Sequence, residues 1–278
     1  MRKVMFGGVL RVCVWALSLA LLFYATGCAE GTTDQPTPDA AKRFLKLRGY
    51  EFDEESFFKA ASQSDVMAVD GFISAGININ AKDRNDDTAL VAAASRGDAK
   101  IIELLLRRGA DVNARGRNNW TAFLLALQEE RSAVVDQFAS HPRLDLTAET
   151  PERKTALILA VWAQYEPIVR TLLQRGVAVD HQDKDGDTAV HGAALYGNAK
   201  IMELLLDARA NPNLKNRVGG TPLMWAAAYG HGEVVGILLN RGADPKLKDV
   251  DGITAAGWAG KNGHGDLELI LRNAEKSK

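Results

Sequence analysis

Cysteine is almost absent from this sequence. Only Cys13 and Cys28 occur among its 278 residues. Cys13 lies in an apolar segment near the start, so removal of that segment would leave Cys28 as the only thiol, with no partner for a disulfide. No Cys or second His stands at metal-ligand spacing. The sequence therefore predicts no disulfide framework and no metal site.

An excess of charge of one sign is also lacking. The chain has 34 Lys and Arg against 35 Asp and Glu, a net charge of −1. Without the basic start at Arg2, Lys3 and Arg11, 31 basic residues remain against 35 acidic ones. Proteins that bind a phosphate backbone do so through surplus Lys and Arg. We therefore expect no nucleic-acid partner.

The usual short catalytic motifs are missing as well. There is no G-x-x-x-x-G-K-[ST] phosphate loop, no G-x-S-x-G nucleophile elbow and no H-E-x-x-H zinc motif. Glycine is frequent, but Gly219-Gly220-Thr221 fits none of these patterns. The sequence predicts a protein that is not an enzyme and needs no cofactor.

What the chain does contain is a repeat. One threonine recurs every 33 or 34 residues, at Thr88, Thr121, Thr155, Thr188, Thr221 and Thr254. One period before Thr88 stands Glu55, and the residues around it keep the alanine pair and the glycine of the other units. The sequence therefore holds six clear repeats and one eroded repeat at the start.

Each repeat reads as two short helices, shown best by Gly219 to Asp244. Thr221 suits the N-cap and Pro222 the first helical position, where its missing N–H costs nothing. Gly230 ends the first helix and Gly242 the second. Neither helix can bury its apolar side alone, so such units must stack on copies of themselves.

The period and the letters Thr221-Pro222-Leu223 and Thr188-Ala189-Val190-His191 resemble the ankyrin repeat family, whose signature is T-P-L-H-x-A. The resemblance implies an all-α repeat solenoid of helix–turn–helix units joined by β-hairpin loops, about seven units including caps. We expect an ankyrin domain over 42–278. Its units are an eroded repeat at 50–82 and repeats near 83–115, 116–148, 149–182, 183–215, 216–248 and 249–278.

Residues 1–27 read as a signal peptide, with a basic start and an apolar run from Val12 to Tyr24. The small residues before Cys28 resemble the cleavage box of bacterial lipoproteins, in which that cysteine is acylated. An ordinary cleaved signal and an uncleaved membrane anchor are the alternatives, although the run is shorter than the ~20 residues of a span. The resemblance implies an outer-membrane lipoprotein facing the periplasm; a soluble periplasmic or inner-membrane protein is the alternative.

Residues 28–41 are small, polar and contain two prolines, so we expect the lipidated Cys28 to be followed by a flexible tether. A short amphipathic helix is predicted over Ala40 to Arg48, with Phe44, Leu45 and Leu47 on its apolar side. The aromatic residues of 50–58 are expected to close the exposed end of the stack.

The histidines and the hairpin carboxylates have structural interpretations. The resemblance implies that His191, His231 and His264 form internal hydrogen bonds between units, and we expect His141 and His181 to be solvated. Asp183, Asp185 and Asp187 match the opening of a calcium loop, but no Glu follows at the twelfth position. Asp and Gly recur at every unit boundary, so turn formation is preferred.

In ankyrin proteins the partner lies against the hairpin tips and the exposed ends of the inner helices. The resemblance implies a partner-binding concave face made of aromatic and basic residues, types that are enriched at interface hot spots. Trp225 and Trp258 are assigned to packing. The predicted face consists of Trp120, Trp162, Tyr196, Tyr229, Arg84, Arg96, Lys154, Lys184 and Arg217.

We therefore expect a monomeric, membrane-tethered scaffold that binds a protein partner on this face. An inhibitor or immunity-type protein that regulates an enzyme or a toxin is an alternative that the sequence cannot separate from a scaffold. An enzyme with a site hidden in the repeats is the remaining alternative.

Overall fold

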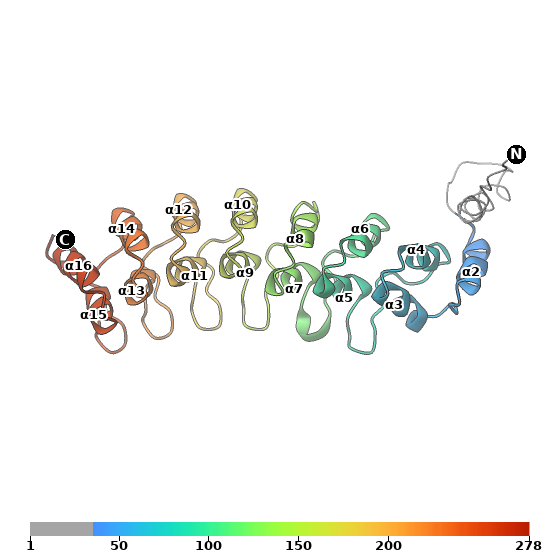
Figure 1. Cartoon of the computed structure of the whole chain (residues 1–278), viewed down its shortest axis with the longest axis horizontal. Helices are drawn as coiled ribbons and strands as arrows, with labels where there is room; N and C mark the ends of the chain where they lie inside the picture. The colour runs from blue at the N-terminus through green and yellow to red at the C-terminus, as the bar shows by residue number, and fades with distance from the viewer. Residues whose placement is uncertain (1–35, 278) are drawn as a thin grey trace, which may run out of the picture.

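The computed structural model describes residues 36–277, which form an elongated row of helix pairs (Figure 1). This part of the chain holds fifteen α-helices and one 3-10 helix, and the predicted all-α solenoid is confirmed. The inner helices are α3 (Glu54–Ser62), α5 (Ala89–Arg96), α7 (Ala122–Gln128), α9 (Ala156–Trp162), α11 (Ala189–Tyr196), α13 (Pro222–Ala228) and α15 (Ala255–Lys261). The outer helices are α4 (Val66–Ser74), α6 (Ala99–Arg107), α8 (Ser132–Ala139), α10 (Glu166–Gln174), α12 (Ala199–Asp207), α14 (Gly232–Asn240) and α16 (Gly265–Ser277).

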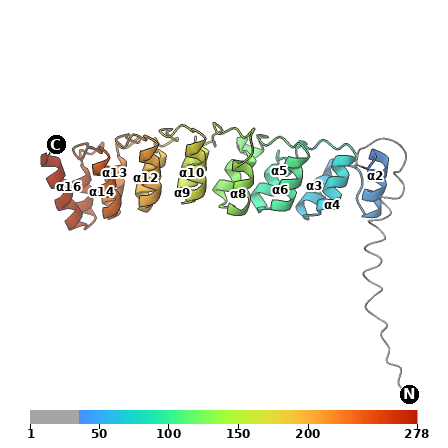
Figure 2. The ribbon, with the colours of Figure 1, turned by 90° about the horizontal axis from the view of Figure 1, so that it is seen from above.

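Inner helices pack on inner helices and outer helices on outer helices, so every unit is covered by its neighbours (Figure 2). The alanine pairs of the inner helices, such as Ala93–Ala94 and Ala193–Ala194, are fully buried. Their small side chains let the helices lie close together. The outer helices add larger apolar residues, including Phe72, Phe138 and Leu205, which are also fully buried.

The recurring threonine begins each inner helix. The hydroxyls of Thr88, Thr121, Thr155, Thr221 and Thr254 accept a hydrogen bond from the amide three residues later. Such a cap satisfies an amide that the helix itself cannot pair. Thr188 instead contacts the Nδ1 atom of His191, with its Oγ1 3.0 Å away.

The hairpin loops lie in a row along one edge of the molecule (Figure 1). In each regular loop one carboxylate or amide oxygen binds two backbone amides: Oδ1 of Asp183 accepts from Asp185 N and Asp187 N, both at 2.9 Å. Asp83, Asn216 and Asp249 do the same in their own loops. The interpretation as turn residues is confirmed, and the part of the chain that the structure describes contains no cluster that could hold a metal.

The N-terminal end begins earlier than expected. Helix α2 (Pro38–Leu47) starts inside the segment predicted as tether, because Thr37 caps it and Pro38 suits its first position. Ala41 and Leu45 are buried against α4, whereas Leu47 is 83% exposed. Residues two apart in an α-helix point to nearly opposite sides, so Leu47 faces away from Leu45. The assignment of Leu47 to the apolar side was therefore wrong. Among the described helices, none is long and apolar enough to cross a membrane.

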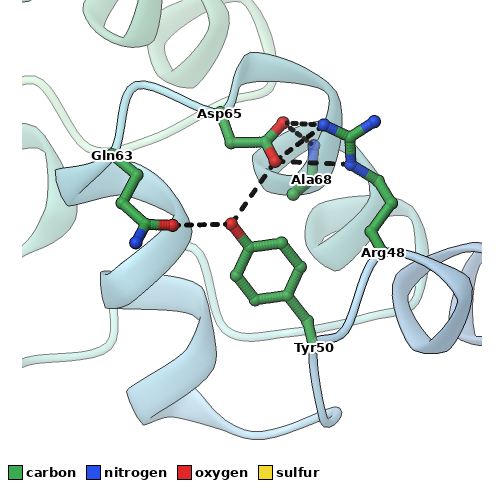
Figure 3. Close-up of polar contacts among 5 residues, drawn as sticks. All are labelled: Arg48, Tyr50, Gln63, Asp65 and Ala68. Carbon is green, nitrogen blue, oxygen red and sulfur yellow. Dashed lines mark hydrogen bonds and ion pairs between the residues drawn. The ribbon is translucent and has the colours of Figure 1, made fainter.

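A polar network fixes α2 and the loop after it to the first repeat (Figure 3). The guanidinium of Arg48 donates to both carboxylate oxygens of Asp65, at 3.0 and 2.8 Å. The hydroxyl of Tyr50 donates to Gln63 Oε1 at 2.9 Å. Desolvation raises the pKa of Asp65, but hydrogen bonds from Arg48 and Ala68 N outweigh it, so this pKa lies below its usual value. Tyr50 also packs edge-on against Phe72, and α2 itself covers α4 at this end of the stack.

Candidate protein-binding face

The predicted binding face combines two parts of the fold. We define the hairpin tips as residues 82–87, 115–120, 149–154, 182–187, 215–220 and 248–253. The binding face comprises these tips and the exposed ends of the inner helices behind them. Loops on a rigid scaffold are the usual place for recognition residues.

Three predicted residues meet at the centre of this face. The Nζ atom of Lys154 lies 3.7 Å from the centroid of the Trp162 ring, a close cation–π contact. The ring of Tyr196 meets Trp162 edge-on, with centroids 6.4 Å apart and an angle of 79° between planes. Lys154 comes from a hairpin tip, Trp162 ends α9 and Tyr196 ends α11. Three separate segments therefore build this aromatic cluster.

Trp162 lies one residue earlier in its inner helix than Tyr196 does, when both are counted from the capping threonine of their repeats. It follows Thr155 by seven residues, whereas Tyr196 follows Thr188 by eight. The indole fits because Gly192 faces it: a Cβ atom on Gly192 would lie 3.0 Å from both Cδ1 and Nε1 of Trp162. Nε1 is buried there without a hydrogen-bond partner in the described part of the chain. Trp162 is thus half-buried, lines the site and turns its indole N–H towards Gly192.

A hollow of about 190 Å³ opens beside the cluster. Leu127 and Leu159 are among its apolar lining residues, while Lys154, Trp162, Tyr196 and Glu130 also line it. A second hollow of about 230 Å³ adjoins it and shares Leu127, Glu130 and Ala163. Both are open depressions of a size that suits side chains of a partner.

The position of the hollows follows from the sequence at the junction of the two repeats whose inner helices are capped by Thr121 and Thr155. Glu130 takes a left-handed conformation, with φ 53°, at the position of Gly97 and Gly197 in other repeats. The next repeat places Arg131 over Gly97 and His231 over Gly197. Tyr165 holds that position after Glu130, and its hydroxyl instead donates to Asp136 at 3.1 Å. Two adjoining hollows lie at this junction.

The other two predicted aromatics differ in exposure. Tyr229 is 58% exposed and its ring stacks on His231 with centroids 6.2 Å apart. Trp120 lies in a hairpin tip and packs, half-buried, against the core. Trp225 and Trp258 are packing residues as expected; Nε1 of Trp258 donates to Asp249 Oδ2 at 2.8 Å.

The predicted basic residues fall into two groups. Arg84 pairs with Glu55 at 2.9 Å, and Arg96 donates to the carbonyl oxygen of Ala61 at 3.0 Å. Arg96 is therefore partly committed to joining two repeats. Lys184 and Arg217 are exposed and form no ion pair with any described residue.

Sequence reasoning missed Arg117 and the two leucines of the hollow. Arg117 occupies the same tip position as Arg84, Lys184 and Arg217, a register visible in the spacing. Leu127 and Leu159 are buried core residues that line the hollow, and nothing in the sequence distinguishes them from other core leucines.

The repeat histidines join neighbouring units, as expected. Nε2 of His231 lies 2.9 Å from Leu195 O, and Nε2 of His264 lies 3.2 Å from Ala228 O. His191 is fully buried, with Nε2 3.1 Å from Gly220 O. Burial lowers the pKa of His191 to about 4, although the hydrogen bond to Gly220 opposes the shift.

The remaining two histidines are not simply solvated. Nε2 of His181 lies 2.9 Å from Arg153 O and 3.5 Å from the Glu149 carboxylate. Nδ1 of His141 accepts the amide of Arg143 at 3.3 Å. Both histidines remain partly exposed, as expected, but each also has a backbone partner in its loop. Cys28, the predicted lipidation site, and the signal segment lie outside the described residues.

A family model described as "Ankyrin repeats (3 copies)" matches this chain four times, in overlapping stretches. The matched residues are 34–116, 57–149, 157–249 and 205–277. Together these matches span nearly all of the described residues.

Two solved structures illustrate the similarity. An ankyrin repeat domain from Acinetobacter baumannii AYE is 27% identical, with a TM-score of 0.61; the match covers 66% of this chain and 96% of that one. The ankyrin repeat domain of Bcl-3, described as a unique member of the IkappaB protein family, is also 27% identical. Its TM-score is 0.63, and the match covers 73% of this chain and 92% of that one.

Proposed function

Because this chain belongs to the ankyrin repeat family, whose domains generally mediate protein–protein interaction, we propose that it is a non-catalytic scaffold that binds a protein partner on the binding face. The hairpin tips and inner helices provide a long, preformed surface. Its partner therefore docks without ordering the scaffold, which lowers the entropic cost of association.

The observation that carries this proposal is the cluster of Lys154, Trp162 and Tyr196 beside the hollow. Trp and Tyr are enriched at hot spots when they border a pocket that a partner can fill. Tyr196 is 40% exposed and Tyr229 is 58% exposed, whereas most other large apolar side chains of the repeats are buried. Exposed aromatic rings are costly in an isolated monomer, and burial by a partner would remove that cost.

The proposed location is the bacterial envelope. Residues 1–27 would act as the signal, and acylated Cys28 would hold the solenoid at the membrane through the segment before α2. Cys28→Ser should abolish labelling by a fatty-acid analogue and release the protein from membranes or leave its signal uncut. An unmodified Cys28 in the intact mass of the mature protein would refute lipidation without affecting the proposed binding face.

The binding test compares variants on and off the face. Partner capture from envelope extracts, followed by titration of the purified partner, should give one stoichiometric complex with the wild-type protein. Tyr196→Ala and Tyr229→Ala should each weaken binding by roughly 2 kcal/mol, with little change in thermal stability. Leu269→Ala, an exposed residue on α16, is the control and should bind as the wild type does.

One result would contradict the proposed face and another the scaffold function itself. Full-strength binding by both tyrosine variants would place the partner on another surface. Turnover of a small molecule by the pure protein would favour the enzyme instead. Inhibition of a captured enzyme or toxin by the solenoid would identify the protein as a regulator that uses the same face.

A further inference from the structure

Basic and acidic side chains are placed differently on the hairpin tips. Within the described tips, nine Lys and Arg side chains are exposed against four Asp and Glu side chains. Six further carboxylates on the tips are buried or half-buried. When half-buried Lys154 is counted as well, the tips hold ten basic and ten acidic residues, so the positive excess is confined to the side chains that are exposed.

The buried and half-buried carboxylates of the tips face away from solvent because they accept hydrogen bonds that join the hairpins. Oδ1 of Asp87 accepts the backbone amide of Arg117, on the next tip, at 2.8 Å. Asp187 accepts Nδ2 of Asn216, also on the next tip, at 2.9 Å. Desolvation raises the pKa of Asp187, which is the cost of burying a carboxylate in this structural role.

Some bases also join tips, since Lys215 Nζ donates to Lys248 O at 2.8 Å and Arg117 lies 3.8 Å from Asp87 Oδ2. The side chains of Lys184 and Arg217 make no such contact with a described residue. Arg84, Arg117, Lys184 and Arg217 occupy the same position on four tips. Backbone hydrogen bonds connect successive tips at this position: Lys184 N donates to Glu152 O at 2.8 Å, and Arg217 N donates to Asp185 O at 2.9 Å. These four bases therefore form a row along the tips that is interrupted at the third tip, where Pro151 holds the position.

We propose that the partner segment that crosses the hairpin tips is acidic, with Asp or Glu opposite this row and aromatic or aliphatic side chains reaching the hollow beside Trp162. The inference rests on the proposed function, since it names the chemistry of the partner at the same face. Complementary charge accelerates association and excludes partners of the wrong sign. Lys184 and Arg217 are available to such a segment because neither is neutralised within the described residues.

The row suits a polypeptide better than a phosphate surface. Exposed carboxylates, among them Glu152 and Asp185, alternate with the bases on the same tips. A nucleic acid or an anionic membrane presents negative charge continuously and would be repelled at those positions. An acidic peptide can place a neutral residue opposite each of them.

The experiment uses the full chain after removal of the signal and two fluorescein-labelled peptides. One peptide of about 16 residues repeats Glu, Ser and Tyr, and the other has Lys in place of Glu. Anisotropy titrations run at about 20 and about 200 mM NaCl, because salt screens exposed charges.

A single-stranded oligonucleotide and phosphatidylglycerol vesicles are the competing probes. The variant is Lys184→Glu/Arg217→Glu, and the control is Arg43→Glu/Lys46→Glu, an equal charge change on exposed residues of α2.

The acidic peptide should bind at low salt, weaken as salt rises and lose at least about tenfold in affinity in the hairpin variant, but less than about twofold in the α2 control. No binding of the acidic peptide, equal loss in both variants or tighter binding of the basic peptide would overturn the inference. Tighter binding of the oligonucleotide or vesicles that depends on Lys184 and Arg217 would overturn it in favour of a phosphate surface. A further outcome is that the captured partner binds the hairpin variant at full strength but fails to bind the tyrosine variants. That result would support the proposed function and overturn the inference that the partner segment is acidic.

Discussion

The imidazole of His231 occupies the space that a side chain at Gly197 would need. A Cβ atom on Gly197 would lie 2.4 Å from Nδ1 of His231, and the backbone of Gly197 is left-handed, with φ 68°. The same imidazole reaches the carbonyl oxygen of Leu195 through Nε2. One glycine thus ends α11 and makes room for the histidine that joins the next repeat. Gly230 and His264 repeat the arrangement one unit later.

Gly197→Ala should therefore destabilise the protein by more than its backbone strain alone. An alanine at positive φ costs about 1 kcal/mol, and displacement of His231 adds the loss of a hydrogen bond worth about 1 kcal/mol. Gly176→Ala is the matched control, because Gly176 has φ 75° and nothing within 4 Å of a Cβ. Urea unfolding should show a loss about twice as large at Gly197.

A double-mutant cycle isolates the interaction between the two residues. His231→Ala in the Gly197→Ala background should cost less than His231→Ala alone, because the contact is already lost. Additive effects would mean that His231 moves aside without loss, and the coupling would be absent.

Stacking of the outer helices predicts unequal costs at adjacent leucines. Leu205 is fully buried in α12, while its neighbour Leu204 is only half-buried. Leu205→Ala should cost ~2–5 kcal/mol through lost burial and a residual cavity. Leu204→Ala should cost clearly less. Similar small losses at both positions in chemical denaturation would contradict the packing of α12 between α10 and α14.

The sequence was sufficient for the fold because its signals are local and repeated. A threonine cap, a small inner helix and a glycine stop act within one unit, and the 33-residue period shows that the units stack. The same register would have identified Arg117 beside Arg84. By contrast, Leu47 could not be placed from the pattern of one short helix, since three apolar residues there point in different directions.

The site was less predictable because it depends on contacts between repeats. The place of Trp162 is set by Gly192 of the next unit, and Arg96 is engaged by a carbonyl of the previous one. Neither partner is adjacent in sequence. The hollow lies where Glu130 and Tyr165 replace the glycine and histidine that pair elsewhere, as in Gly197 and His231. The sequence shows this replacement, but only the structure shows that it leaves open space.

The contact between Gly192 and Trp162 gives a prediction for the binding face. Gly192→Ala places a Cβ 3.0 Å from the indole, so Trp162 must shift away from its present position. Lys154 and Tyr196 should lose their contacts with it, and tryptophan fluorescence should shift to longer wavelength as the indole becomes more exposed. Gly236→Ala on α14, where a Cβ would meet nothing within 4 Å, should leave the spectrum unchanged.

The network at Asp65 predicts how α2 is held. Asp65→Asn removes the charge that binds Arg48 but keeps an oxygen for the amide of Ala68. Since the Arg48 side chain is 37% exposed, solvent screens its ion pair with Asp65. We therefore expect the free energy of unfolding to fall by about 1 kcal/mol. Hydrogen exchange should accelerate in α2 and not in α12. Lys46→Gln, on the exposed side of α2, is the control, and equal acceleration there would assign the effect to helix charge rather than to the network.

His191 predicts a loss of stability in mild acid. The pKa of this imidazole is about 4 in the folded protein and near its ordinary value of 6.5 in the unfolded chain, so the unfolded chain takes up the proton first. The stabilisation is complete above about pH 6.5 and falls as the pH drops towards 4, by at most about 3 kcal/mol.

Urea unfolding at pH 7.5, 5.5 and 4.5 should show this loss in the wild type. His191→Gln should be less stable at pH 7.5, because Gln cannot reproduce the bonds to Thr188 and Gly220, but should lose less on acidification. Carboxylates titrate in both proteins, so the difference between the two profiles reports His191 alone. Parallel profiles would show that protonation of this imidazole is not coupled to unfolding.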